Sequence, residues 1–360
     1  MEKQVFNNKN IFIENCNGIG DLIMLTPVLR GLKEKYPSAC ITILTKKKNI
    51  PVIEKLDYID KICFYENGKL FGGWPVIKAL HKADAVCYYT HQPQLQWITR
   101  LLGAELSAGR IKKKYRRFKL FSVRLEDDAD NYEYKTDYFR RYIEQALGVK
   151  LPVEYTCDVS LPDAATGQRS RNILREAGVP EAGGYIVLAP FGNTAAGIPL
   201  ELLKEIVLYI NNKYRMPCVV INDKEDSGIR SLQAELKKKN AALYDLCGKT
   251  SLPELLAIIR EAALLIATDS GPMHAACAMG VRTIALFSTD FHEKWGPKHN
   301  CRVISLDIPC RPCNKETIAI CEHKKCMRGI TMDRLIPVID SYGGLGREVS
   351  PREARHSRKL

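Results

Sequence analysis

The stretch ATDSGPMHAACAMGVRTIALF (residues 267–287) predicts a strand, a turn, a helix and a second strand in direct succession. The apolar run AALLIA that leads into it is typical of a buried strand, whose carboxyl end would carry Asp269. Pro272 favours a helix start, because a first-turn residue needs no N–H donor. The final TIALF predicts a neighbouring parallel strand, so the stretch forms one βαβ unit.

The turn of this unit concentrates groups that bind anions. The N–H groups of a first helical turn favour a negative charge, and a diphosphate in particular. Ser270 is placed to cap the helix or to bind a phosphate oxygen, beside Asp269 and Gly271. His274 lies in the same turn and can donate a hydrogen bond or a proton to the same anion. The alternative is a capped helix with a structural histidine, but the combination of the four residues favours a site.

The same alternation of apolar runs and helical patterns extends over most of the chain. It begins with NIFIEN and DLIMLTPVLRGLKEKY, weakens across residues 105–180, and restarts at GYIVLAP. The weaker stretch, with its basic and acidic runs and LPDAATGQRS, is typical of a linker. The pattern predicts two doubly wound α/β domains, which divide within residues 155–175. Ligands of such sheets bind beyond the carboxyl ends of the strands.

A second motif, ENCNGIGDLIMLTP, lies near the start of the chain. Gly18 and Gly20 separate a strand from a helix, which permits a tight turn and a close approach of a ligand to backbone N–H groups. Ile23 replaces the third glycine of a dinucleotide fingerprint, and no Gly-Lys-Ser/Thr follows, so nicotinamide and nucleotide-hydrolase sites are disfavoured. Asp21 remains. It is either a carboxylate favoured by the helix dipole or a general base for a hydroxyl group.

Composition and charge narrow the class of protein. The chain has 360 residues, 46% of them hydrophobic and 26% charged, which is typical of globular proteins. No apolar run reaches the roughly 18 residues of a membrane span, and the N-terminus lacks a signal-peptide pattern, so we expect a cytoplasmic protein. The 13 cysteines are then expected to be mostly reduced thiols.

The net charge of +13 is concentrated in two places, the stretch GRIKKKYRRFK (109–119) and the C-terminal REARHSRKL. Both are either solvated segments or surfaces for nucleic acid, acidic lipid or a phosphorylated glycan. No zinc-finger, RNA-recognition or helix-turn-helix signature is found, so nucleic acid is not expected as a partner.

Together the two motifs resemble glycosyltransferase family 9, the ADP-heptose:lipopolysaccharide heptosyltransferases and their relatives. The matching stretches are GIGDLIMLTPVLRGLKEKYPSACITILT, LYDLCGKTSLPELLAII, ATDSGPMHAACAMGVRTIALF and FHEKWGP. The resemblance implies a GT-B fold, in which two Rossmann-like domains face each other across a cleft. The predicted divisions are residues 1–160 for the acceptor, 161–341 for the nucleotide-sugar, and 342–360 for a basic, flexible tail.

The resemblance also implies roles for individual residues. Asp21 would deprotonate the acceptor hydroxyl in an inverting transfer that needs no metal, and Gly18 and Gly20 would form the acceptor-side loop. The residues implied in binding the nucleotide-sugar, expected to be ADP-heptose, are Asp269, Ser270, Gly271, His274, Gly192, Asn193, Thr194 and Glu225. The acceptor would be an anionic lipopolysaccharide-core or related glycan, met peripherally at the cytoplasmic face of the inner membrane by the basic stretch.

One departure from the family pattern concerns the leaving diphosphate. The family has a lysine shortly before an aromatic-Pro pair, whereas this chain has Ala196 and Ile198 at those positions. The missing cation is expected from Lys249, Lys294 or Lys298. The absence of this lysine leaves two alternatives open. The protein uses a different sugar donor, or it is a nucleotide-sugar or glycan-binding protein of the same fold without catalytic activity.

A cysteine cluster, CRPCNKETIAICEHKKC, ends the informative part of the chain. Cys310, Cys313, Cys321 and Cys326 follow C-x2-C-x7-C-x4-C spacing, and His323 could substitute for one of these ligands. Four thiolates in a loop suit a structural zinc or iron ion. The second pair lacks the usual C-x2-C spacing, so free or redox-labile thiols are the alternative. The proposed transfer requires no catalytic role for these thiols and no metal cofactor.

Overall fold

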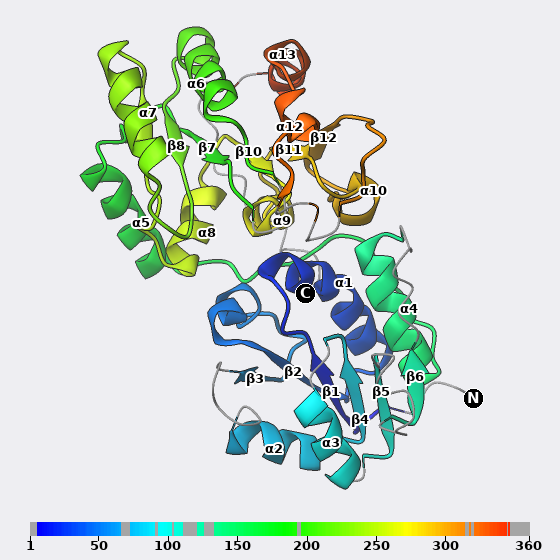
Figure 1. The fold of residues 1–360 in the computed structure, drawn as a ribbon. Coiled ribbons are helices and arrows are strands. Elements are labelled where there is room, and N and C mark those ends of the chain that lie inside the picture. The colour runs from blue at the N-terminus through cyan, green and yellow to red at the C-terminus, as the bar shows by residue number, and fades with distance from the viewer. Residues whose placement is uncertain are drawn as a thin grey trace. The chain divides into compact units, whose positions relative to one another are not determined.

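Two separate six-stranded sheets, in which all described neighbours pair in parallel, organise the chain (Figure 1). The computed structural model describes residues 6–65, 73–90, 93–102, 104–110, 121–125, 133–192, 196–313, 317, 320–343 and 345. The first unit comprises Met1–Leu161 and Glu293–Lys298, and the second comprises Pro162–His292 and His299–Leu360. The sequence predicts a boundary between 160 and 161, and does not predict that residues 293–298 group with the first unit.

The first sheet has the strand order β3-β2-β1-β4-β5-β6. Its helices α2 and α3 cover one face, and α1 and α4 cover the other (Figure 1). The strands are β1 (Asn10–Glu14), β2 (Cys40–Lys46), β3 (Lys61–Tyr65), β4 (Ala85–Tyr88), β5 (Leu106–Arg110) and β6 (Val123–Leu125). The helices are α1 (Ile19–Lys35), α2 (Trp74–His81), α3 (Pro93–Leu102) and α4 (Lys135–Leu147), with a short 3-10 helix, η1 (Lys47–Val52).

The second sheet has the equivalent order β12-β11-β10-β7-β8-β9. Its strands are β7 (Ile186–Ala189), β8 (Cys218–Val220), β9 (Leu243–Asp245), β10 (Leu264–Thr268), β11 (Thr283–Phe287) and β12 (Cys301–Ser305). The helices are α5 (Ala164–Glu176), α6 (Leu200–Tyr214), α7 (Ser227–Lys238), α8 (Leu252–Arg260), α9 (Gly271–Ala278), α10 (His292–Trp295), α12 (Lys325–Arg328) and α13 (Met332–Asp340). In the described part of the chain, no helix combines the length and the apolarity that crossing a bilayer requires.

Burial on both faces explains the composition of the strands. Every residue of β4, β7, β10 and β11 is buried, as is β1 beyond its first residue. Parallel strands covered by helices on both sides therefore appear as continuous apolar runs, without the alternation of a half-exposed sheet. This is why the runs IFI, LLIA and TIALF are reliable signals in the sequence.

The linker predicted across residues 105–180 is wrong in large part. This stretch contributes β5, β6, α4 and α5. Helix α4 buries Phe139, Tyr142, Ile143 and other residues along one face, while mostly charged and polar residues occupy the rest. The apolar residues of α4 recur with a regular helical period, but many charged residues lie between them. For this reason the composition of the stretch resembles that of a linker, although its periodicity does not. The basic residues 111–119 of the predicted acceptor surface lie outside the described residues, as does nearly all of the predicted tail.

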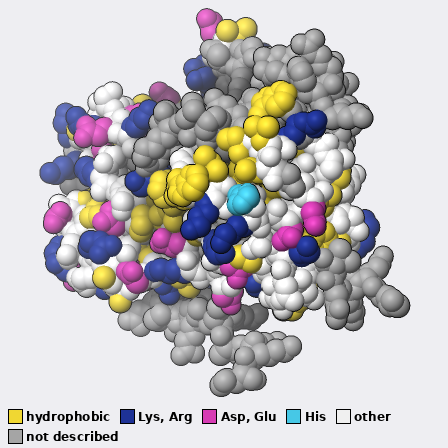
Figure 2. All heavy atoms as spheres, turned by 90° about the horizontal axis from the view of Figure 1, so that it is seen from below, with side chains coloured by type: hydrophobic (Ala, Val, Ile, Leu, Met, Phe, Trp, Pro, Cys, Tyr) yellow, Lys and Arg dark blue, Asp and Glu magenta, His cyan; other side chains and the backbone are white. Residues whose placement is uncertain are grey.

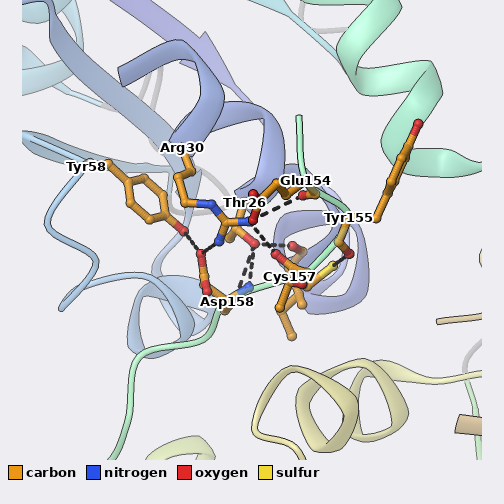
Figure 3. Close-up of polar contacts among 9 residues, drawn as sticks. Thr26, Arg30, Tyr58, Glu154, Tyr155, Cys157 and Asp158 are labelled. Atoms are coloured by element: carbon orange, nitrogen blue, oxygen red, sulfur yellow. Dashed lines mark hydrogen bonds and ion pairs between the residues drawn. The ribbon is translucent and has the colours of Figure 1, made fainter. Parts of the chain in front are cut away.

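The segment after α4 runs back along α1 and is fixed there by Asp158 (Figure 3). The Asp158 carboxylate forms an ion pair with Arg30 and accepts a hydrogen bond from the Tyr58 hydroxyl at 2.8 Å. Its backbone N–H donates to Thr26 Oγ1 at 2.8 Å. Arg30 also donates to the carbonyl of Thr156 at 2.8 Å. These contacts anchor the end of the first unit to the helix that carries Asp21.

Close contact between this segment and α1 generates a stability prediction. A Cβ atom at Gly31 would lie 2.0 Å from the carbonyl oxygen of Pro152. Gly31→Ala is therefore expected to lower the free energy of unfolding by about 1–3 kcal/mol, measured by urea denaturation. Gly167→Ala in α5 is the matched control, because its Cβ would meet no described atom nearer than 3.6 Å. Equal stability of the two variants would contradict the close contact.

Candidate active site

Each predicted motif lies where the winding of its sheet reverses. In the first sheet β1 neighbours β4, although two strands separate them in the sequence. In the second sheet β7 neighbours β10 in the same manner. A crevice opens at the carboxyl ends of strands at such a point, and open α/β sheets bind ligands there. Asp21 follows β1, and the residues from Asp269 to His274 follow β10, so both motifs are at these positions.

Asp21 lies in the first turn of α1, directly after the loop that leaves β1. Its side chain is half-buried, and Asn17 Nδ2 donates to Asp21 Oδ1 at 3.3 Å. Burial raises the pKa of Asp21 above its ordinary value, while the Lys135 ammonium and hydrogen bonds from Gly18 and Asn17 act in the opposite direction. A raised pKa makes the carboxylate a stronger base, and the nearby cation favours its ionised form.

Lys135, the first residue of α4, is a functional candidate that the sequence analysis misses. Its ammonium lies 4.1 Å from the ring centroid of Tyr138 and 5.1 Å from those of Phe139 and Trp295. Trp295 belongs to the segment Glu293–Lys298 of the first unit. Three aromatic faces thus hold a cation whose field acts on Asp21. No sequence motif connects Lys135 to Asp21, because only the packing of α4 on α1 brings them together.

Gly18 and Gly20 do not form the tight turn that the sequence predicts. Gly18 is the N-cap residue in an extended conformation, with φ −77°, and Gly20 is already inside α1. A Cβ at Gly18 would come no closer than 3.9 Å to Asp21 Oδ2. The backbone therefore does not require glycine here, and the acceptor-side role of the two residues remains a prediction that depends on ligand contact.

A buried carboxylate, Glu14, joins the two strands at the reversal point of the first sheet. It ends β1 and accepts hydrogen bonds from the Cys16 N–H at 2.8 Å, the Thr90 N–H at 2.8 Å, and the Thr90 hydroxyl. Burial raises the pKa of Glu14, and these hydrogen bonds oppose that shift. Thr90 follows β4, so Glu14 fixes the loop that leads to Asp21 against the end of the neighbouring strand.

In the second unit, α9 begins at Gly271, as the sequence predicts, and Ser270 is its N-cap residue, but the Ser270 side chain makes no capping hydrogen bond. The Ser270 hydroxyl donates instead to the carbonyl of Thr268 at 3.0 Å. The N–H groups of Met273 and His274 are bonded to the Ser270 carbonyl, at 3.1 and 3.5 Å. Since Pro272 has no N–H, Gly271 carries the first-turn N–H that these bonds leave for an anion. The prediction that the Ser270 side chain caps α9 is therefore wrong.

His274 is held as a neutral ring. Its side chain is 5% exposed, and burial lowers its pKa to about 4. Its Nε2 lies 3.8 Å from Asp269 Oδ1, which is too long for a hydrogen bond. At neutral pH His274 can therefore donate one hydrogen bond to a ligand but cannot contribute a positive charge.

The loop after β7 explains why position 196 carries no lysine. Ala196 and Ile198 are buried in the hydrophobic core, 7% and 3% exposed. The Ala196 N–H donates to Ser288 Oγ at 3.0 Å, and that of Ile198 donates to the Pro190 carbonyl at 2.9 Å. A lysine at position 196 would have to leave this core. Gly192 is half-buried in the loop after β7, while Asn193 and Thr194 lie outside the described residues.

The three predicted replacement cations each have a local contact within their own unit, and their role at a diphosphate remains a prediction. Lys249 donates to the carbonyl of Asp245 at 2.7 Å, at the end of the edge strand β9. Lys294 and Lys298 belong to the first unit, next to the rings of Trp295 and Tyr134. An unpredicted cation, Arg311, donates to the carbonyls of Leu306 and Asp290, the second of which is in the loop after β11.

Glu225 occupies the loop after β8, on the carboxyl side of the second sheet. Its side chain is exposed and forms an ion pair of 2.6 Å with Arg230. Its neighbour Asp226 accepts from the Ile229 N–H and caps α7. The position is compatible with contact to a ligand at this edge, and the assignment of Glu225 to a ribose remains a prediction.

The cysteine cluster does not form a metal centre in the described part of the chain. All four thiols are free, and no group of three or more His, Cys, Asp or Glu residues is arranged to hold an ion there. Burial raises the pKa of Cys313 and Cys326, and the neighbouring thiols add to this effect. The described residues therefore do not support the structural zinc or iron ion that the spacing suggests.

Comparisons with known proteins identify the family to which the chain belongs. A model of glycosyltransferase family 9 (heptosyltransferase) matches residues 206–323. The chain is 33% identical to lipooligosaccharide heptosyltransferase 2 of Campylobacter jejuni over 328 residues, which cover 91% of this chain and 96% of the relative. The chain belongs to glycosyltransferase family 9 and is a transferase.

Solved structures of the family share the fold. A family 9 glycosyltransferase from Veillonella parvula has a TM-score of 0.75 and 18% identity, covering 93% of this chain and 97% of its own. The ADP-heptose lipopolysaccharide heptosyltransferase II of Escherichia coli has a TM-score of 0.70 and 15% identity, covering 92% and 98%. The two parallel-sheet domains are therefore those of the GT-B fold.

The electrostatic effect of Lys135 on Asp21 predicts a change in pH dependence. A general base must be ionised, so if Asp21 has the predicted role, activity falls as the pH drops through its pKa. Because the Lys135 cation lowers that pKa, Lys135→Met is expected to move the acidic limb of kcat/KM to higher pH. The matched control is Lys61→Met, an exposed lysine of β3. An unchanged limb in Lys135→Met, or an equal shift in the control, would contradict the proposed effect.

Because His274 is buried, we predict that its imidazole ring does not titrate near neutral pH. Between pH 5.5 and 8 the imidazole resonances of His274 are expected to stay constant in NMR spectra, because the ring protonates only near the pKa of about 4. A His274→Gln variant assigns the resonance. A midpoint between pH 6 and 7 would show that the ring is accessible and charged in part at neutral pH.

Proposed function

We propose that the protein transfers a heptose from ADP-heptose to a lipopolysaccharide-core or related glycan, with inversion at the anomeric carbon. The observation that carries the proposal is the placement of a half-buried carboxylate, Asp21, at the reversal point of the first sheet. The relative named lipooligosaccharide heptosyltransferase 2 and the structural neighbour named ADP-heptose heptosyltransferase II support the donor and the acceptor class. In this proposal the first domain binds the acceptor and the second binds the nucleotide-sugar.

The chemistry follows from charge. Asp21 accepts the proton of the acceptor hydroxyl while the hydroxyl oxygen forms a bond to the anomeric carbon. The bond between that carbon and the β-phosphate oxygen breaks, and its electron pair leaves with ADP. Negative charge thus shifts from the acceptor side to the leaving diphosphate, where fixed donors aimed at it lower the barrier.

The donors proposed for the diphosphate are the Gly271 N–H and the neutral His274 ring at the start of α9, beside Asp269 and Ser270. The loop of Gly192, Asn193 and Thr194 and the carboxylate of Glu225 complete the proposed donor site. Removal of one such preorganised donor commonly costs about 10²–10³ in rate. We propose that no divalent metal takes part, so activity is expected to persist in a chelator.

The proposed acceptor is anionic and held in a membrane, so the protein would act peripherally at the cytoplasmic face of the inner membrane. The basic residues 109–119 would meet phosphate or carboxylate groups of that acceptor. Nucleic acid is not part of the proposal, because the chain carries none of the common nucleic-acid-binding signatures.

One observation favours a second candidate, a nucleotide-sugar or glycan-binding protein without catalytic activity, or a relative that uses another donor. No lysine is present at position 196, and the structure buries this position in the core. The retention of Asp21 opposes a purely binding role, since a half-buried carboxylate with a raised pKa is costly unless it has a use.

Replacement of Asp21 distinguishes the two candidates. Asp21→Asn is expected to lower the rate of heptose transfer by about 10²–10⁴, because the amide cannot accept the proton. Binding of ADP, measured by calorimetry, should be nearly unchanged. Asp57→Asn, an exposed carboxylate of the same unit, is the matched control and should retain full activity.

Two outcomes would contradict the proposal that Asp21 is the base of a heptose transfer. Wild-type protein that binds ADP-heptose but transfers no sugar to a panel of truncated lipopolysaccharides would favour the binding protein. Full transfer by Asp21→Asn would show that another group is the base.

A further inference from the structure

Two neighbouring helices of the first unit carry an unusual concentration of exposed apolar side chains. Among the described residues the large hydrophobic side chains that are exposed are Phe64, Trp74, Trp97, Leu101 and Ile320. Three of these five lie on α2 and α3, which pack side by side. Trp74 is 72% exposed and Leu101 is 82% exposed. A single exposed apolar residue is ordinary, but a group on adjacent elements marks an interaction surface.

Helical spacing separates this surface from the core. Val76 and Leu80 of α2 turn inward and pack with Phe12 and Val86 of the sheet. Trp74, Lys78 and His81 follow at intervals of four and three residues, so they share the opposite face of α2, and all three are exposed. The burial of the face with Val76 and Leu80 therefore determines that the face with Trp74, Lys78 and His81 points outward.

The same arrangement holds for α3. Ile98 and Leu102 pack against the core, whereas Trp97, Arg100 and Leu101 are exposed. Both helices thus present an aromatic or aliphatic side chain next to a basic one. Figure 2 views the molecule from the side on which α2 and α3 lie in Figure 1, and shows apolar side chains gathered beside Lys and Arg, with a histidine near them.

The charge of these helices has one sign. Neither the Trp74–His81 nor the Pro93–Leu102 sequence contains an acidic residue, and Lys82 follows α2 directly. The carboxylate of nearby Asp84 is already engaged within the protein. It accepts hydrogen bonds from Lys9 Nζ at 2.8 Å and from the Asn10 N–H at 2.7 Å. Glu105, which follows α3, is exposed and forms an ion pair of 3.5 Å with Lys9. Helices that combine Trp and Leu with Lys, and that contain no carboxylate themselves, complement the anionic headgroups and the interfacial zone of a bilayer.

We infer that the outer face of α2 and α3 is a membrane-docking surface, on which Trp74 and Leu101 insert between anionic lipids while Lys78 and Lys82 contact their headgroups. Indole rings prefer this depth, because they are apolar in body and carry one N–H donor. The inference rests on the proposed function only in that a glycolipid acceptor lies in a bilayer. It assigns membrane contact to described residues of α2 and α3, in addition to the basic stretch 109–119.

The test is sedimentation of the full chain with vesicles that contain neither donor nor acceptor. Wild-type protein is expected to bind vesicles with 30% phosphatidylglycerol and to bind pure phosphatidylcholine vesicles far less. A basic side chain near an anionic bilayer raises the binding constant about fivefold, so K78E/K82E should lower it about 25-fold or more. W74A/L101S should lower it by at least a similar factor and abolish the blue shift of tryptophan emission on binding.

Two controls of matched chemistry lie in the second unit. K237E/K238E reverses two exposed charges of α7, and I320S removes an exposed apolar side chain. Both should bind vesicles as the wild type does. All the altered residues are exposed, so unchanged thermal unfolding is expected and confirms that the variants fold.

Three outcomes would overturn the inference: no binding of wild-type protein to anionic vesicles, binding by W74A/L101S equal to wild type, or equal loss in the controls. A dimer in the absence of lipid that W74A/L101S disrupts would assign the face to a second copy of the chain and would also overturn it. Transfer to a delipidated acceptor measures the proposed function separately. It should persist in W74A/L101S, so a failure of docking and a failure of catalysis are distinguishable.

Discussion

In each sheet the first and fourth strands of the unit are neighbours, because the chain reverses its winding direction after the third. The helices that follow these two strands lie on opposite faces, so no helix covers the carboxyl ends between them. Polar and charged side chains that would be costly in the core are tolerated there. The position of Asp21 after β1, of Glu14 at the end of β1, and of the α9 turn after β10 all depend on this constraint.

The two units carry different types of polar groups at their candidate sites, a carboxylate in the first and neutral hydrogen-bond donors in the second. Around Asp21 the first unit combines burial, which raises the pKa of the carboxylate, with the Lys135 cation, which opposes that rise. At the start of α9 the second unit has a neutral imidazole and a backbone N–H, which are hydrogen-bond donors without full charge. Such an arrangement suits proton removal in one domain and stabilisation of a leaving anion in the other, as the proposed transfer requires.

Much of the fold could be predicted from the sequence, because buried parallel strands leave continuous apolar runs such as IFI and TIALF. The strand–turn–helix at Asp269 could also be found, since Pro272 and the small residues around it mark a helix start. Helix α4 could not be predicted from composition, because charged residues lie among its apolar ones, although its apolar period is regular. Composition outweighed periodicity in that stretch.

The missed site residues have a different cause. Thr90 and Glu14 are 76 residues apart in the chain and meet only because β1 and β4 are neighbours. Lys135 acts on Asp21 through the packing of α4 on α1, which no local pattern encodes. The missing lysine at position 196 could be noticed in the sequence, but its physical reason, the burial of Ala196 beneath Ser288, required the structure.

The configuration of the product tests the central claim most directly. If Asp21 removes a proton from the acceptor during a single displacement, the heptose must reach the acceptor with its anomeric configuration inverted. NMR coupling constants of the anomeric proton, measured on donor and product after reaction with ADP-heptose, are therefore expected to show opposite configurations. Retention of configuration would contradict the account, because a single displacement from the face opposite the leaving group always inverts the anomeric carbon.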